Sequence, residues 1–379
     1  MYRFISETYG RMKGKGMRLF ALSLFGLLAS PACVCAQDNA KVFSKPKFSG
    51  YAIGQYQYSG QQGAESNTFS LRMIRFSLDG RILNDFAYKI QGQANGNTAT
   101  LGDSPRLVDV FIEWQKLSFL KIKAGQFKRP FTFENPMHPI DQGFMSYSQN
   151  VSKLAGFSDR VGEHASNGRD IGVQLQGDLF KTSSGRPLFH YQVGVFNGQG
   201  INTKDVDNRK DVIGGAWIMP VEGLRIGGFG WTGSYARKGN DGVKSLSKNR
   251  YAISGEYVFD DWTFRSEYIH SIGYGFKTVY NQSADLKADE VNTAAGNKAD
   301  GFYALAIAPV IKKKLHVKAR YDLYRPQAEW NTSKTYYEIG VDYMFTKNLQ
   351  VNLEYALVND RSLDSHNYSL IDTQFSFRF

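Results

Sequence analysis

The chain ends with the sequence YSLIDTQFSFRF, which occupies residues 368–379. Within it, Phe375, Phe377 and the terminal Phe379 share one parity, whereas Gln374 and Arg378 share the other. Successive side chains of a β-strand point to opposite faces. The stretch therefore predicts a strand with one apolar face and one polar face that ends on an aromatic residue at the chain terminus.

The same alternation recurs along the chain in segments of roughly ten residues, bounded by Gly, Asn, Asp, Ser or Pro. In one segment Phe86, Tyr88 and Ile90 alternate with Lys89 and Gln91. We predict sixteen strands, with fourteen and eighteen as alternatives, because strand boundaries read from a sequence are uncertain by about two to four residues. The predicted strands cover residues 47–58, 69–82, 85–94, 107–115, 118–127, 169–180, 188–197, 210–220, 224–236, 249–259, 261–272, 300–311, 314–325, 334–345, 348–358 and 368–379.

Short and long connections alternate between these strands. Asp260-Asp261, for example, suits a two-residue hairpin turn. Short turns on one rim and long loops on the other are typical of a transmembrane antiparallel β-barrel, in which the last strand closes against the first. The mean hydropathy of −0.39 agrees with this class, because only every second side chain of such a strand faces lipid. Long loops are predicted at residues 59–68, 95–106, 198–209, 237–248, 273–299, 326–333 and 359–367.

The first 36 residues predict a secretory signal peptide. From Met17 the chain has a basic start, an apolar run over residues 19–29 and small residues before Ala36, where we expect cleavage. Residues 37–379 then form one barrel domain, and the start codon is either Met1 or Met17. The sequence around Cys33 also loosely resembles a lipoprotein signal, so lipidation of that residue is the alternative.

The mature chain has 343 residues, no cysteine and a net charge of +7, from 41 basic and 34 acidic residues. Cys33 and Cys35, the two cysteines of the sequence, lie in the leader. The barrel is therefore expected to be stable without disulfides. The charge is far weaker than the clustered Lys and Arg of a nucleic-acid-binding protein, so we expect no nucleic-acid partner.

An irregular segment interrupts the strand pattern between Gly125 and Asp170. It begins with GQFKRPF at residues 125–131 and ends in RDIGV at residues 169–173. Connections this long in a compact domain are usually functional or disordered. We expect this one, over about residues 128–169, to fold into the lumen as a third long loop and to narrow the pore.

Side chains opposite the apolar faces should line the lumen. The simplest interpretation is a solvated wall whose charges pair across neighbouring strands, which leaves selectivity to the narrowest point of the pore. The acidic candidates are Asp79, Glu113, Glu267, Asp322, Asp342, Glu354 and Asp372. The basic candidates are Arg75, Lys89, Lys121, Lys123, Arg265, Lys318, Arg320 and Arg378.

The GQFKRPF motif resembles the Gly-Gln-Phe-Lys-x-Pro-Phe motif of the phosphate-selective porin O and P family. RDIGV, the later YQVGVFNG at residues 191–198, the Arg320-Tyr321-Asp322 triplet and the Phe379 terminus also resemble that family. The resemblance implies a trimeric outer-membrane porin of sixteen strands, with a third loop in the lumen and basic side chains that guide anions.

By position, the resemblance places Lys128 and Arg129 at the start of the inward loop, and Arg160 and Arg169 near its return. Arg75, Lys89, Lys121, Lys123 and Arg320 complete the predicted anion-guiding set. The loop also carries acidic residues, so a general channel for small hydrophilic solutes with a mild anion preference fits better than selection of phosphate. These acidic residues are Glu134, Asp141, Asp159, Glu163 and Asp170.

Two other functions are considered. A barrel enzyme would need a nucleophile and a base on the outer wall, and Ser266 with His270 is the nearest pairing. An exported all-β binding or adhesion protein is the third hypothesis. The six histidines lack metal-ligand spacing, so we expect no metal, no cofactor and no enzymatic activity.

Overall fold

The computed structural model describes residues 42–94, 105–239, 242–279 and 290–379. The chain divides into residues 1–44 and 45–379, and the fold reported below is that of the second unit. The predicted leader, with its cleavage after Ala36 and both cysteines, lies outside the described residues.

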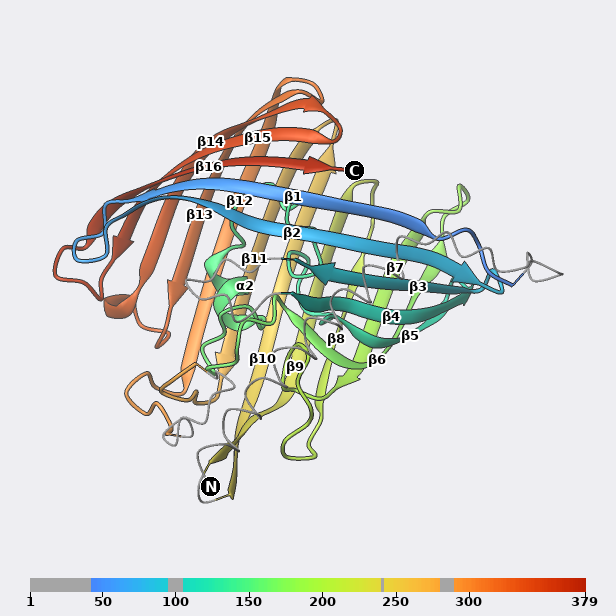
Figure 1. The fold of residues 1–379 in the computed structure, drawn as a ribbon, viewed down its shortest axis with the longest axis horizontal. Helices are drawn as coiled ribbons and strands as arrows, with labels where there is room; N and C mark the ends of the chain where they lie inside the picture. The colour runs from blue at the N-terminus through green and yellow to red at the C-terminus, as the bar shows by residue number, and fades with distance from the viewer. Residues whose placement is uncertain (1–41, 95–104, 240–241, 280–289) are drawn as a thin grey trace, which may run out of the picture. The chain divides into compact units, whose positions relative to one another are not determined.

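Sixteen antiparallel strands form one closed barrel, in which each strand pairs with its neighbours in sequence and β1 pairs with β16 (Figure 1). The predicted fold class and strand count are therefore confirmed. The strands are β1 (Lys47–Ser59), β2 (Ser66–Ile82), β3 (Phe86–Gln93), β4 (Arg106–Leu117), β5 (Leu120–Lys128), β6 (Arg169–Lys181), β7 (Pro187–Phe196), β8 (Asp211–Ile218), β9 (Leu224–Gly239), β10 (Gly242–Phe259), β11 (Trp262–Ile272), β12 (Lys298–Ile311), β13 (Leu315–Arg325), β14 (Lys334–Thr346), β15 (Leu349–Asp360) and β16 (Asn367–Arg378).

Helical structure is sparse in the part of the chain that the structure describes. It consists of α2 (Gln149–Leu154), within the long segment between β5 and β6, and of the short 3-10 turn η3 (Trp330–Thr332). Within the described residues, no helix has both the length and the apolar character needed to cross a membrane.

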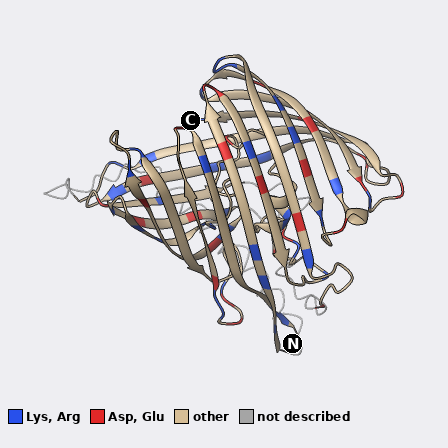
Figure 2. Cartoon of the chain, turned by 180° about the vertical axis from the view of Figure 1, so that it is seen from behind, with Lys and Arg blue, Asp and Glu red and all other residues tan. Residues whose placement is uncertain are grey.

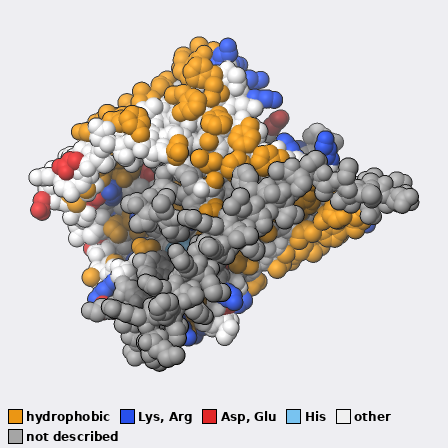
Figure 3. All heavy atoms as spheres, viewed as in Figure 1, with side chains coloured by type: hydrophobic (Ala, Val, Ile, Leu, Met, Phe, Trp, Pro, Cys, Tyr) orange, Lys and Arg blue, Asp and Glu red, His pale blue; other side chains and the backbone are white. Residues whose placement is uncertain are grey.

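The polarity of the barrel is inverted relative to a soluble protein. On β16, Phe375 and Phe377 are 46% and 41% exposed, whereas Gln374 and Ser376 are 2% and 1% exposed. Apolar side chains spread over the outer surface (Figure 3), and basic and acidic residues follow one another along the strands (Figure 2). A soluble all-β protein would place these groups the other way round, so this distribution argues against the third hypothesis.

The hairpin turns follow from local sequence. Asp260 and Asp261 both adopt positive φ, 44° and 73°, between the paired residues Phe259 and Trp262. This is the two-residue turn predicted from the sequence, in a backbone conformation that Asp tolerates. The long loop predicted at residues 237–248 is wrong, because β9 and β10 continue to Gly239 and from Gly242 and leave only two residues between them.

The barrel closes where β1 meets β16. Gly50 and Phe379 exchange two backbone hydrogen bonds of 3.0 Å, and the Phe379 ring lies 6.3 Å from that of Phe48 and 6.0 Å from that of Phe76. A Cβ atom on Gly50 would lie 2.4 Å from the Phe379 ring and 2.8 Å from the carbonyl oxygen of Arg75. The terminal aromatic therefore depends on a glycine in the first strand.

This contact predicts that Gly50→Ala impairs closure of the barrel. The added methyl group forces the Phe379 ring and the neighbouring backbone apart, which should lower the free energy of unfolding by about 1–3 kcal/mol. Gly54→Ala on the same strand is the matched control, because a Cβ there has no neighbour within 4 Å. Thermal unfolding followed by heat-dependent gel mobility compares the two variants. Equal midpoints would contradict the prediction.

Candidate functional site: the loop within the barrel

Residues 129–168 connect β5 to β6 and run inside the barrel. Met145 illustrates this position, because its carbonyl accepts a hydrogen bond from Arg72 of β2 and its N–H donates to Glu354 of β15 at 2.9 Å. Glu267 of β11 accepts the N–H groups of Phe133 and Glu134 at 3.0 and 2.7 Å. A segment that contacts inward side chains from strands far apart around a closed ring lies within the ring, where Figure 1 shows α2.

Basic side chains of the wall hold the carbonyl groups of this loop. Irregular backbone at membrane depth is tolerated only where its polar groups find partners. Arg265 of β11 donates to the carbonyl of Gln142, Lys318 of β13 to that of Gly143, and Arg320 of β13 to that of Ser146, each at 2.9 Å. Three of the predicted lumen-facing cations thus bind protein backbone.

Acidic side chains hold the N–H groups of the same loop. In addition to Glu267 and Glu354, Asp322 of β13 accepts the N–H of Gln149 at 2.8 Å, at the start of α2. Ser148 precedes the helix and makes no side-chain capping bond to it. An acidic side chain of the barrel therefore satisfies a donor that a capping residue would otherwise bind.

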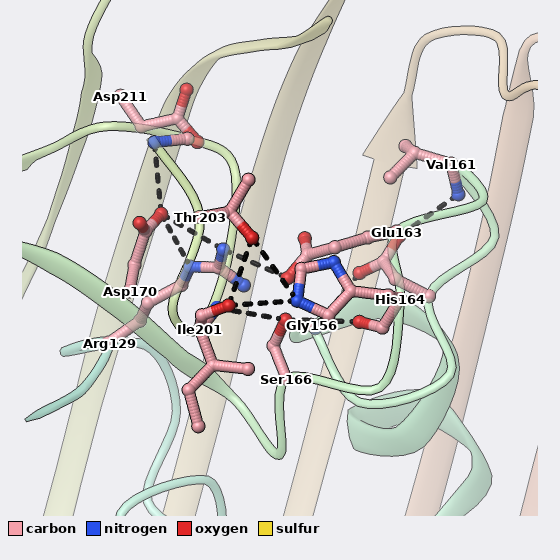
Figure 4. Close-up of polar contacts among 12 residues, drawn as sticks. Arg129, Gly156, Val161, Glu163, His164, Ser166, Asp170, Ile201, Thr203 and Asp211 are labelled. Atoms are coloured by element: carbon pink, nitrogen blue, oxygen red, sulfur yellow. Dashed lines mark hydrogen bonds and ion pairs between the residues drawn. The ribbon is translucent and has the colours of Figure 1, made fainter. Parts of the chain in front are cut away.

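The return of the loop is anchored by a buried ion cluster around Arg129 (Figure 4). Its Nη2 lies 3.1 Å from Glu163 Oε1 and 2.9 Å from Asp170 Oδ2, and all three side chains are fully buried. Asp170 also accepts the N–H of Gly198 at 2.9 Å. Burial alone would lower the pKa of Arg129, but Glu163 and Asp170 raise it above its ordinary value. This arginine remains charged and holds the loop to β6.

A second buried ion pair joins the loop to β10. Arg250 binds Asp159 with two hydrogen bonds of 2.7 Å and donates to the carbonyl of Leu154 at 2.7 Å. Burial would raise the pKa of Asp159, but Arg250 lowers it below its ordinary value. The guanidinium groups of Arg129 and Arg250 lie 4.9 and 4.6 Å from the ring of Trp231. The two anchors therefore share one aromatic side chain of β9.

Apolar side chains fill the space between the loop and the wall formed by β8 and β9. Phe131 packs edge-on against Trp231 at 5.5 Å, and Phe133 packs edge-on against Trp217 and Phe229 at 5.4 Å each. These rings belong to a buried cluster that also includes Val151, Leu154 and Phe157 of the loop. This side of the lumen is a packed core.

The predicted anion-guiding residues fall into three groups. Arg129, Arg169 and Arg320 form buried ion pairs, with Arg169 bound to Asp109 at 2.7 and 2.9 Å and Arg320 to Glu338 at 2.5 and 2.9 Å. Lys89, Lys121 and Lys123 pair with Asp79, Asp178 and Glu113 at 3.2, 3.4 and 3.6 Å. Arg160 donates to the carbonyls of Gly273, Ala295 and Gly296 at 2.6, 3.3 and 3.1 Å, and so holds another loop.

Lys128 and Arg75, like Arg160, have no carboxylate partner among the described residues. The Lys128 ammonium donates to the carbonyls of Asn135 and Met137 at 2.6 and 2.8 Å and to the Tyr147 hydroxyl at 2.8 Å. Arg75 is 1% exposed, donates to the Gln93 side chain at 3.0 Å and has an unpartnered Nη2. Their charges are therefore balanced only at longer range.

Sequence reasoning missed Arg72. The pairing of β1 with β2 slips between Ile53 and Gly54, so the strand opposite has one extra residue, which is Arg72. Such a bulge allows two residues separated by an odd number of positions to face the same side. Arg72 and Arg75 are three positions apart. Two arginines at an odd spacing within one strand could have indicated the bulge from the sequence.

Sequence reasoning also placed Arg237 wrongly, in an outer loop. It lies in β9, is 2% exposed and donates to the carbonyl of Gly162 in the inward loop and to the carbonyl of Thr278 at 2.5 Å. Ser266 and His270 are four positions apart on β11, which corresponds to about 13 Å along a strand. The structure therefore does not bring this proposed catalytic pair together. No metal-binding cluster occurs among the residues that were described.

Two cavities flank the inward loop. The first, of about 290 Å³, lies against the inner wall of β1 to β7 and includes Arg75, Lys123, Lys128 and the paired Arg169 and Asp109. The second, of about 410 Å³, lies against β13 to β16. Its acidic lining residues are Glu338, Glu354, Asp360 and Asp372, and its basic lining residues are Lys153 and Lys334. The first cavity is thus mainly basic and the second mainly acidic.

The buried pair between Arg250 and Asp159 predicts a large effect of Arg250→Met. Removal of one partner leaves an unpaired buried carboxylate, which should cost about 3–5 kcal/mol and release the return of the loop. Limited proteolysis of the folded barrel, together with thermal unfolding, measures both effects. The double variant Arg250→Met/Asp159→Asn is the control and should regain part of the loss. A double variant as unstable as the single one would rule out the buried charge as the cause.

His138 predicts a response of the loop to acid. It lies 4.4 Å from the Tyr51 ring, near Asp141, Arg378, Lys128 and Arg75, and burial lowers its pKa to about 4 although Asp141 opposes the shift. Neutral His138 therefore stabilises the folded state above its ordinary pKa of about 6.5, and this contribution is lost as the pH falls towards 4. The thermal midpoint should fall between pH 7 and pH 4, and by less in His138→Gln. Parallel pH profiles would contradict this.

Residues 49–217 match the family model described as phosphate-selective porin O and P. A comparison with curated proteins gives no match. Among solved structures, the chain is similar to an anion-selective porin from Comamonas acidovorans, with 12% identity and a TM-score of 0.61 over 88% of this chain and 99% of that chain. OmpF of Salmonella typhi in complex with daunomycin shares 14% identity, with a TM-score of 0.62 over 88% and 98% of the two chains.

The trimer form of OmpT from Vibrio cholerae has 13% identity and a TM-score of 0.56 over 88% of this chain and 99% of that chain. At these identities the structural similarity shows a shared fold only. The relationship in sequence rests on the match to the family model. The resemblance noted in the motifs is confirmed. The chain is an outer-membrane porin, and its residues 49–217 match the phosphate-selective porin O and P family.

Proposed function

We propose that the protein is a passive diffusion channel for small hydrophilic solutes, that residues 129–168 form its constriction, and that it prefers anions mildly. One observation carries the preference. Among the described residues, Lys128 and Arg75 border the first cavity and pair with no carboxylate. The other predicted anion-guiding side chains form ion pairs, except Arg160, which binds backbone and does not line that cavity. An unpaired charge beside a narrow aqueous path between low-dielectric walls acts on passing ions more strongly than a neutralised pair.

This proposal revises the roles of several predicted residues. Arg129 and Arg320 have almost no exposed surface and contact carboxylates directly, so they serve to position the loop. Lys89, Lys121 and Lys123 remain partly exposed and add a weaker, locally balanced field. Among the described residues that line the first cavity, only Arg75 and Lys128 are cations without a carboxylate partner, and this small number favours a general anion preference over selection of phosphate.

The mature barrel is proposed to start after Ala36 and to assemble as a homotrimer in the outer membrane, with lipid around its apolar outer wall. The signal-peptide pattern of the sequence supports the first point. The second is supported by the trimer form of the structurally similar OmpT. Crosslinking of the folded protein in detergent, followed by its mobility with and without heating, tests the assembly.

Planar bilayer recording tests the channel and its preference together. The wild type should give stepwise conductance, and in a KCl gradient its reversal potential should show chloride to be more permeant than potassium. Lys128→Gln should move the permeability ratio towards one, whereas Lys128→Arg should retain it, because the charge is kept. The effect should be larger at 0.1 M salt than at 1 M, where the Debye length falls from about 10 to about 3 Å.

Lys238→Gln is the matched control, because Lys238 is an exposed residue of β9 and the substitution removes the same charge. A selectivity change as large in this control as in Lys128→Gln would show that the overall charge, and not the cavity, sets the preference. Membranes that stay silent with folded protein would refute the channel itself.

A further inference from the structure

The two ends of the first cavity differ in charge, and the anion preference proposed above does not depend on this difference. Its cations that have no carboxylate partner within the described part of the chain are Arg75, on β2, and Lys128, at the end of β5. At its other edge, β6 and β7 contribute the neutral amides of Gln174, Gln176 and Gln192. The nearby cations Lys123 and Arg169 are paired with Glu113 and Asp109. One end of the cavity thus offers positive charge, and the other offers uncharged hydrogen-bonding groups.

The cationic end is built to receive an anion. Arg75 is 1% exposed and its Nη2 has no hydrogen-bond partner, although a buried guanidinium normally pairs with an acid or with several oxygens. The nearby Asp109 binds Arg169 through two short hydrogen bonds, so it is not available as a partner for Arg75. The planar fork of an arginine suits a carboxylate or a phosphate equally well.

The amide end selects a different part of the solute. Gln176 and Gln192 are directly opposite each other on β6 and β7, and Gln174 donates to the side chain of Gln176 at 2.7 Å. Gln176 also donates to Glu113 at 2.5 Å. A carboxamide has two donors and two acceptor positions, so these bonds leave other groups of the row for hydroxyls, which both donate and accept. Chloride can only accept hydrogen bonds, and inorganic phosphate has fewer hydroxyl groups than a sugar acid, so either anion would leave part of the amide row without a partner.

The size of the cavity agrees with a solute larger than one inorganic ion. Its volume of about 290 Å³ corresponds to roughly ten water molecules, at about 30 Å³ each. Small-molecule sites place a few polar groups at defined positions around a space of this order.

From this arrangement we propose that the first cavity is a binding subsite for small carboxylates that carry several hydroxyl groups, such as hexuronic acids. The carboxylate binds Arg75 and lies near the charge of Lys128, whose three N–H groups already have acceptors in the loop, and the hydroxyl groups lie along Gln174, Gln176 and Gln192. This proposal rests on the proposed channel function and adds a class of solute to it.

Solute-induced interruption of the single-channel current tests the subsite in the full-length protein in KCl. Glucuronate should interrupt the current at a concentration roughly tenfold or more below those needed with acetate, glucose or inorganic phosphate, because only glucuronate uses both ends of the cavity. Arg75→Gln should raise the blocking concentration of glucuronate roughly tenfold. Gln192→Leu should reduce the advantage of glucuronate over acetate and leave the block by acetate unchanged.

The controls separate this proposal from the channel function. Lys238→Gln should keep the wild-type response to all four solutes. If Arg75→Gln does not give a folded barrel, the comparison of Gln192→Leu with the wild type decides. Phosphate that blocks at a lower concentration than glucuronate, or a conducting wild-type channel that glucuronate does not block, overturns the subsite while the channel stands. The absence of conductance overturns the channel function first.

Discussion

An irregular stretch of backbone inside a membrane barrel must find a hydrogen-bond partner for every peptide group, and most of this structure depends on that constraint. The wall meets it with charged side chains. Cations of β2, β11 and β13 bind carbonyl groups of the inward loop, and carboxylates of β11, β13 and β15 bind its N–H groups. The basic and acidic side chains of the lumen therefore serve largely to bind the backbone of the loop.

This use of charge limits what the same side chains do for permeating ions. A cation that binds a carboxylate at hydrogen-bond distance contributes little net field, and several of the basic residues in this lumen are bound in this way. Arg129 and Arg250 are extreme cases, because both are buried beside Trp231 and hold the return of the loop. In the proposed channel, selectivity depends on the few cations that have no carboxylate partner among the described residues, of which Lys128 and Arg75 line a cavity.

The loop also divides the lumen into parts with different physical character. Where Phe131 and Phe133 pack against Trp217, Phe229 and Trp231, the space is a dry core. The cavities remain along β1 to β7 and along β13 to β16, where polar and charged side chains face them. The first cavity is mainly basic and the second mainly acidic, and the apolar cluster holds the loop against β8 and β9.

The sequence alone determined the barrel, its sixteen strands and the tight turn at Asp260, because period-two alternation and turn chemistry are local properties. The ion-pair partners and the roles of individual cations were decided by the tertiary structure. Arg129 was expected to guide anions, but only the folded barrel brings Glu163 and Asp170 to it from 34 and 41 positions away. Arg72 faces inward because a bulge shifts the register, and Arg237 reaches the loop because β9 extends beyond its predicted end. These partners are residues distant in sequence that meet only in the folded barrel. The alternation of polar and apolar residues is a local pattern, so it does not predict which of them pair.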